Sequence, residues 1–256
     1  MNFKKIIIYK EPAISEINIE KLINYLENNF PVKVEIKDNI FKEFSLEDIR
    51  KLSNIRIINI KNSFSKHKST NIEIEFEAKL CKNSSVMDST TRVENAQEIS
   101  QVFMYDGFEL QKILRYLDHN NETLHIVLTN RLTCTFDEND SRYHARAVIC
   151  ANPAIISTTG IIEAPAKPKD YYFEVMALKS QGLDIKSAKE KYKEEFLEYN
   201  DKRLTKIVEG YILQVIFYNI TGEPFCEDIK CRLNNAHWQK DLLFSQLGIN
   251  KLCEKH

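Results

Sequence analysis

The sequence of 256 residues lacks an excess of charge of either sign and lacks any long hydrophobic run. Its 36 basic and 37 acidic residues give a net charge of −1, so the composition offers no broad electrostatic argument for binding nucleic acid or an anionic membrane. No segment approaches the length of a membrane span. The apolar run near the N-terminus is too short for the core of a signal peptide. We therefore expect a cytoplasmic protein without a membrane or nucleic-acid partner.

The six cysteines lack the even distribution of a disulfide framework. Cys81, Cys134 and Cys150 are isolated, whereas the other three lie at or after Cys226. This pattern suits the reduced thiols of a cytoplasmic protein, and we expect the isolated cysteines to behave as small apolar residues. The chain shows no internal repeat and no interdomain linker. We therefore predict one domain, residues 1–256, with residues 222–256 as a zinc-binding C-terminal subregion.

Strand and helix patterns alternate from the start of the chain. Lys5–Tyr9 is a short β-rich run, Val32–Ile36 alternates apolar and polar residues, and Ile19–Phe30 between them places apolar residues at helical spacing. Further strands are predicted at 56–60, 72–76, 124–136 with a turn at 129–131, 144–150, 154–157 and 161–162, and further helices at 45–52, 107–119, 172–180, 187–199 and 236–247. This order predicts an α/β (α+β) fold with a mixed twisted sheet and packed helices.

One helix is predicted to form the centre of the molecule. Residues 203–221 carry apolar side chains on almost every side, which is typical of a buried helix. Gly222 stands where a left-handed residue would end this helix, and Pro224 prevents its continuation. We expect the segment after the glycine to be fastened to the end of the helix.

Zinc ligands are predicted directly after this helix. Cys226 and Cys231 form a C-x4-C pair, and Cys253 and His256 form a C-x2-H pair. Two such pairs can close a tetrahedron of three sulfur atoms and one imidazole nitrogen, which leaves no open position for water and indicates a structural zinc. Two alternatives are that the cysteines are unrelated reduced thiols and that His237 takes the place of His256.

The same residues carry a family resemblance. A long helix, a glycine, a cysteine soon after it, a C-x4-C pair and a distal ligand pair are together similar to the archaemetzincins, which are zincin-type metallopeptidases with the pattern H-E-x-x-H-x-x-G-x-x-H-C and a second, cysteine-bound zinc. From about Tyr105 onward, the chain more closely resembles an uncharacterised archaeal family labelled as candidate metallopeptidases. The phrases that carry this likeness are TNRLTCTFDENDSRYHARAVIC, STTGIIEAPAKP, TGEPFC and CRLNNAHWQ. The resemblance implies a zincin-like fold.

The catalytic part of that pattern is missing. In the same register, Val215 and Ile216 occupy the positions of the His-Glu pair, Asn219 that of the second histidine and Phe225 that of the third. The motif works because two histidines on one helix face hold zinc while the glutamate activates the bound water. The sequence therefore predicts a zincin-shaped protein without the usual hydrolytic centre.

Other residues are candidates for a different site. Arg142, His144 and Arg146 share one face of a predicted strand, and arginine suits a carboxylate. With Arg131, the two strand arginines are predicted to bind an acidic ligand or a peptide terminus, although pairing with the nearby residues Asp137, Glu138 and Asp140 is the alternative. The candidate catalytic residues are Asn219, Glu163, His144 and Tyr143, with Glu163 as a general base.

Two hypotheses follow from these residues. The first is a catalytically silent zincin-like protein that binds a peptide or another acidic partner and uses zinc only to hold its tail. The second is an active hydrolase with an unconventional centre near Asn219, Glu163 and His144.

Overall fold

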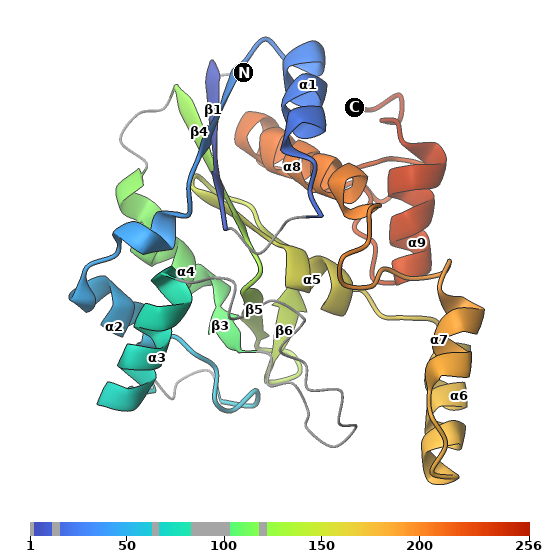
Figure 1. Ribbon diagram of the computed structural model, residues 1–256. Coiled ribbons are helices and arrows are strands. Elements are labelled where there is room, and N and C mark those ends of the chain that lie inside the picture. The colour runs from blue at the N-terminus through green and yellow to red at the C-terminus, as the bar shows by residue number, and fades with distance from the viewer. Residues whose placement is uncertain (1–2, 12–15, 63–66, 83–102, 118–121) are drawn as a thin grey trace.

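The computed structural model describes residues 3–11, 16–62, 67–82, 103–117 and 122–256 (Figure 1). Its larger sheet has five strands in the order β2-β1-β4-β8-β7. These strands are β1 (Lys5–Lys10), β2 (Lys33–Lys37), β4 (Thr123–Thr129), β7 (Val148–Ile149) and β8 (Ala154–Ser157). Every neighbouring pair is parallel except β7 and β8, which are antiparallel. The mixed α/β character predicted from the sequence is confirmed.

A smaller sheet has the order β3-β5-β6. Its strands are β3 (Met104–Asp106), β5 (Leu132–Asp137) and β6 (Arg142–Arg146). The prediction of one continuous strand through residue 150 is wrong, because β6 pairs with β5 whereas β7 pairs with β8. Only Ala147 separates β6 from β7, so the chain passes directly from the edge of one sheet to the edge of the other.

Helices cover both faces of the larger sheet (Figure 1). On one face, α1 (Ile19–Asn29) and α8 (Leu204–Thr221) pack against apolar side chains such as Ile6, Ile126 and Ile156. On the other face, α2 (Leu46–Asn54), α3 (Asn71–Lys82) and α4 (Gly107–Leu114) contribute to a second apolar cluster with Ile7, Val127 and Ile155. Since consecutive residues of a strand point to opposite faces, the apolar runs of β1, β4 and β8 supply both clusters.

The remaining helical segments follow β2, α4 and β8. They are the short 3-10 helices η1 (Ile40–Glu43) and η4 (Arg115–Leu117), the helices α5 (Thr158–Glu163), α6 (Lys169–Ser180), α7 (Lys186–Tyr192) and α9 (Gln239–Leu243), and the π-helical turn η5 (Phe244–Ile249). Figure 1 shows α6 and α7 extending side by side away from the sheets. None of the described helices combines the length and the hydropathy that crossing a membrane requires.

The central helix has the predicted properties. Every residue of α8 from Leu204 to Ile216 is buried except Lys206, which is half-buried. Gly222 follows with φ of 83°, and its backbone N–H donates to the carbonyl oxygen of Tyr218 (2.8 Å). A residue with a side chain would be strained in this conformation, so the glycine ends the helix.

Three predicted strands are wrong. Residues 72–76 belong to α3, because Thr70 and Glu73 exchange the hydrogen bonds of a capping box at its start. Residues 161–162 lie in α5, where the Ser157 hydroxyl accepts the N–H of Gly160. Residues 56–60 form only an isolated bridge between Arg56 and Tyr105. The predicted tail helix at 236–247 is divided between α9 and η5.

Candidate metal centre and adjoining cleft

Four side chains after α8 converge at one point. The ligand atoms of Cys226, Cys231, Cys253 and His256 all lie within 4.8 Å of one another. Cys226 and Cys231 are buried, and the other two are half-buried. The C-x4-C pair and the C-x2-H pair predicted from the sequence therefore meet, although more than twenty positions separate Cys231 from Cys253. His237 does not belong to this cluster.

The distances in this cluster match a metal site better than a disulfide. The sulfur atoms of Cys226 and Cys253 are 3.9 Å apart, and Nδ1 of His256 lies 3.9 Å from the sulfur of Cys231 and 3.2 Å from that of Cys253. A disulfide needs about 2.05 Å between sulfur atoms. A zinc tetrahedron with bonds of about 2.3 Å to sulfur and about 2.0 Å to nitrogen has edges of about 3.5 to 3.8 Å. The donor set and its spacing fit zinc.

Backbone hydrogen bonds shape the loop of the first ligand pair and join it to the segment of the second. The N–H of Cys226 donates to the carbonyl oxygen of Leu233 (2.9 Å), and the N–H of Arg232 donates to that of Lys251 (2.9 Å). Because the second bond joins the residue after Cys231 to the segment before Cys253, it brings one ligand pair to the other. The imidazole of His256 also packs edge-on against Phe217 of α8 (5.6 Å between ring centroids).

The thiols of the cluster differ in acidity. The neighbouring His256 imidazole lowers the pKa of Cys253 to about 7. Burial raises the pKa of Cys231 to about 11. Cysteine binds a metal as the thiolate, so occupation of this cluster releases protons, most clearly from Cys231.

Arg232 supports the cluster, although no pattern in the sequence indicated it. Its side chain is buried, donates to the hydroxyl of Tyr25 on α1 (2.9 Å) and to the carbonyl oxygen of Lys206 on α8 (2.8 Å), and forms an ion pair with Glu209 (3.1 Å). A buried arginine needs a carboxylate partner, and α8 provides one in the buried residue Glu209. The residue after Cys231 is thus fixed to two helices.

A cleft of about 440 Å³ adjoins the cluster. Its lining residues come from the segment 145–150, from α8, from the loop after α8 and from residues 234–237. They are Phe108, Thr135, Ala145, Arg146, Ala147, Val148, Ile149, Cys150, Ala164, Pro165, Tyr211, Gln214, Pro224, Phe225, Asn234, Asn235, Ala236 and His237. The loops that carry Cys226 and Cys231 also contribute Phe225 and Asn234, so the cleft and the metal-ligand cluster share structural elements.

No carboxylate of the described residues lines this cleft. Val215 and Ile216 are fully buried within α8, and the Asn219 side chain donates to the carbonyl oxygens of Val215 (2.9 Å) and Ala151 (3.4 Å). Burial raises the pKa of Cys150 to about 12, so this thiol stays protonated near neutral pH and is a poor nucleophile. The cleft therefore offers shape and hydrogen-bonding groups rather than an evident acid–base pair.

A comparison with protein families matches residues 2–256 to a family described as "Probable metallopeptidase family (DUF6775)". The chain belongs to this family. Comparisons with curated proteins and with solved structures find no match. Membership therefore supports the resemblance to metallopeptidases over the whole chain, and the cysteine and histidine cluster supplies this member with a set of metal-binding side chains.

The other candidate residues of this family member have separate partners. Glu163 accepts a hydrogen bond from the Tyr199 hydroxyl (2.8 Å), and the Tyr143 hydroxyl donates to Asp106 (2.8 Å). Burial of Tyr143 and its bond to Asp106 raise the pKa of its hydroxyl. Glu163 is not in a cluster with His144 among the described groups of metal-ligating side chains.

Asp140 pairs with two residues of the strand that was predicted to bind an acidic ligand. It lies 2.8 Å from His144 and 2.7 Å from Arg142, and these contacts lower its pKa. Asp137, Asp140 and His144 form a second group that could hold a metal, but it lies at the surface, where such acidic groups are common. Arg146 differs, because it contacts Thr135 (2.7 Å) and has no carboxylate partner among the described residues.

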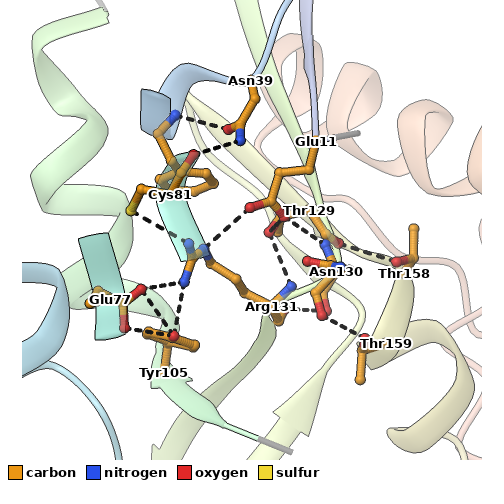
Figure 2. A network of polar contacts seen from close by, with 12 residues as sticks. Glu11, Asn39, Glu77, Cys81, Tyr105, Thr129, Asn130, Arg131, Thr158 and Thr159 are labelled. Carbon is orange, nitrogen blue, oxygen red and sulfur yellow. Dashed lines mark hydrogen bonds and ion pairs between the residues drawn. The ribbon is translucent and has the colours of Figure 1, made fainter. Parts of the chain in front are cut away.

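Arg131 lies in the interior, so its predicted role in binding a ligand does not fit its position. Figure 2 shows its guanidinium between Glu77 on α3 and Glu11 after β1, with the Tyr105 hydroxyl beside it. Both carboxylates are nearly inaccessible, and Arg56 also pairs with Glu77 (2.6 Å). Burial opposes the charged form of Arg131, but the nearby carboxylates and the Tyr105 hydroxyl raise its pKa. Arg131 holds α3 and β1 to the smaller sheet.

Proposed function

We propose that this member of the metallopeptidase family binds one structural zinc ion at Cys226, Cys231, Cys253 and His256. The convergence of three sulfur atoms and one imidazole nitrogen within 4.8 Å is the observation that supports this most directly. Four protein ligands complete a tetrahedron, so the ion would hold the tail against α8 and would leave no position for a substrate or water. Residues 1–256 would form one domain with 222–256 as its zinc-binding subregion.

We further propose a zincin-like arrangement in which hydrolysis has been lost and binding retained. The resemblance to zincins implies that one edge of the sheet lines a substrate cleft. In this chain, the edge strand β7 lines a cleft beside the long helix α8. The positions of the missing catalytic motif supply no metal ligand, and none of the described residues lining the cleft is a carboxylate that could activate water. A cytoplasmic location would keep the three ligand cysteines reduced.

The proposed ligand is an extended peptide that carries a carboxylate. The N–H of Ser157 donates to the carbonyl oxygen of Ala147 (2.8 Å), so the alternation of an antiparallel pair directs the N–H and C=O of Val148 away from β8. No described strand pairs with β7 on that side. An extended peptide can add to such an edge. Arg146 in the same cleft has no carboxylate partner among the described residues. Its guanidinium would donate hydrogen bonds to a carboxylate of the peptide.

Metal analysis together with a peptidase assay tests the zinc and its role. The purified protein is expected to contain one equivalent of zinc, Cys226→Ser is expected to contain none, and neither is expected to hydrolyse a peptide library, because the cleft lacks an acid–base pair. The alternative is a hydrolase centred near Asn219, Glu163 and His144. Two equivalents of zinc, with one retained in Cys226→Ser and accompanied by hydrolysis, would support that alternative instead.

Peptide binding tests the cleft. Labelled hexapeptides of strand-forming sequence are measured by fluorescence anisotropy in three forms: with a free C-terminal carboxylate, amidated with one internal glutamate, and amidated without acidic residues. Arg146→Gln is expected to weaken the acidic forms about tenfold or more, since a charge-assisted hydrogen bond contributes about 1.5 to 3 kcal/mol. Arg142→Gln is the matched control, because Arg142 already pairs with Asp140. Equal losses in both variants would contradict a specific role for Arg146.

A further inference from the structure

Gln214 on α8 is a polar side chain in an unusual position. It is 2 % exposed and lines the cleft. Its Nε2 donates to the backbone carbonyl oxygen of Asn234 (3.4 Å), and no donor among the described residues reaches its Oε1. A carbonyl oxygen can only accept a hydrogen bond, so the contact with Asn234 fixes which end of the amide is nitrogen. The oxygen end is therefore the unpaired one.

An unpaired acceptor at this depth is unfavourable in the unliganded protein. Most buried side-chain polar atoms have a hydrogen-bond partner. An apolar side chain of similar length, such as methionine, would fill the same space without this cost. Polar residues that break a local rule in this way are found at functional sites. The position of Gln214 in the lining of a cleft indicates that its partner comes from a ligand.

The charges of the cleft restrict the kind of donor. Arg146 lines the same cleft, and no carboxylate does so within the part of the chain that the structure describes. An ammonium group would therefore meet a like charge without a compensating anion, which is unfavourable away from bulk water. A neutral amide N–H avoids this repulsion. Because Gln214 approaches the ligand through an acceptor alone, a tertiary amide without N–H would not satisfy it.

We infer that Oε1 of Gln214 accepts a hydrogen bond from a neutral amide N–H of the bound ligand. Gln214 is thereby a specificity residue of the cleft. This inference rests on the binding cleft of the proposed function but on neither the zinc nor the free carboxylate. It deepens the proposed ligand class: the peptide must present an amide hydrogen at this position, so proline or an N-methylated residue would be rejected there.

Two small amides test the inference without requiring that any peptide binds. N-methylacetamide carries one N–H, and N,N-dimethylacetamide carries none. Binding to the zinc-loaded protein is followed through the backbone ¹H–¹⁵N signals of Tyr211 and Asn234, which line the cleft. The wild-type protein is expected to bind N-methylacetamide at least fivefold more tightly than N,N-dimethylacetamide. Gln214→Met is expected to remove this preference, and Gln214→Glu, which keeps an acceptor, is expected to retain it.

Thermal stability gives a second, independent measurement. Without ligand, the Tm of Gln214→Met is expected to exceed that of the wild type by about 2 °C, because the unpaired acceptor is gone. A lower Tm for this variant would show that the amide already serves the fold, and equal binding of both amides to the wild type would overturn the inference. If the amides discriminate but no hexapeptide binds, the peptide proposal falls and the inference stands. If hexapeptides bind but the protein does not distinguish the two amides, the peptide proposal stands and the inference about Gln214 falls.

Discussion

Replacing Cys231 with serine is expected to remove zinc from the protein and to lower its Tm by about 10 °C. Cys231 is fully buried, and its sulfur accepts the N–H of Leu233 (3.5 Å) while facing His256. A serine hydroxyl is a poor zinc ligand, so the two ligand pairs would separate. Loss of a structural metal is one of the few changes that cost about 4 kcal/mol or more, which corresponds to this shift in Tm for a chain of this size.

The fall in Tm of Cys231→Ser should result from loss of the metal and not from loss of the thiol alone. A zinc chelator is expected to lower the Tm of the wild type to that of Cys231→Ser and to leave the variant unchanged. Cys150→Ser is the control, since Cys150 is a half-buried free thiol outside the cluster, and it should keep one equivalent of zinc. Retention of zinc by Cys231→Ser would contradict its assignment as a ligand, and a chelator without effect on the wild type would contradict a stabilising metal.

Replacing Glu77 with glutamine is expected to destabilise the protein by about 3 to 5 kcal/mol, measured as the free energy of unfolding in denaturant. Glu77 is fully buried and pairs with both Arg131 and Arg56. The change leaves two guanidinium groups in the interior with only Glu11 to balance them. Removing one partner of a buried ion pair costs far more than the intact pair contributes, because the remaining charge has lost its solvation as well as its partner.

Glu75→Gln is the matched control for this prediction. It lies two residues earlier on α3 but is exposed, so its replacement should change the free energy of unfolding by less than about 0.5 kcal/mol. A double-mutant cycle of Glu77→Gln with Arg131→Met should give a coupling energy of about 1 kcal/mol or more, since the two groups are in contact. Equal effects of the two glutamate variants, or additivity in the cycle, would contradict the role assigned to this network.

The sequence predicted features that depend on nearby residues. The all-round apolar surface of α8 and its glycine end follow from periodicity and backbone conformation, and both are observed. The grouping of Cys226 and Cys231 with Cys253 and His256 also follows from spacing, because each pair is local. What spacing alone did not show is how Arg232 and Lys251 bring the two pairs together.

The predictions that were wrong concern residues whose partners lie far away in the sequence. The alternation of isoleucine and glutamate at 72–76 is typical of a strand, but it gives way to the capping box at Thr70 and to burial of Glu77 against two arginines. Thr70-x-x-Glu73 was a signal in the sequence that could have identified the helix. Arg131 was predicted to bind a ligand because its buried partners, Glu11 and Glu77, lie far away along the chain. Gln214 gave no signal, since a glutamine in an apolar helix reveals neither its cleft nor its unpaired oxygen.

The contact between Arg232 and Tyr25 bears on how the chain is made. It joins residues 207 positions apart, and Tyr25 lies on α1, which is synthesised well before Arg232. At a translation rate of about 5 to 20 residues per second, Arg232 is synthesised about 10 to 40 s after Tyr25. During this interval the apolar side of α1 has neither α8 nor the cysteine-bearing loop to cover it. We therefore expect this apolar side of α1 to stay exposed in the nascent chain until α8 and Arg232 have been synthesised.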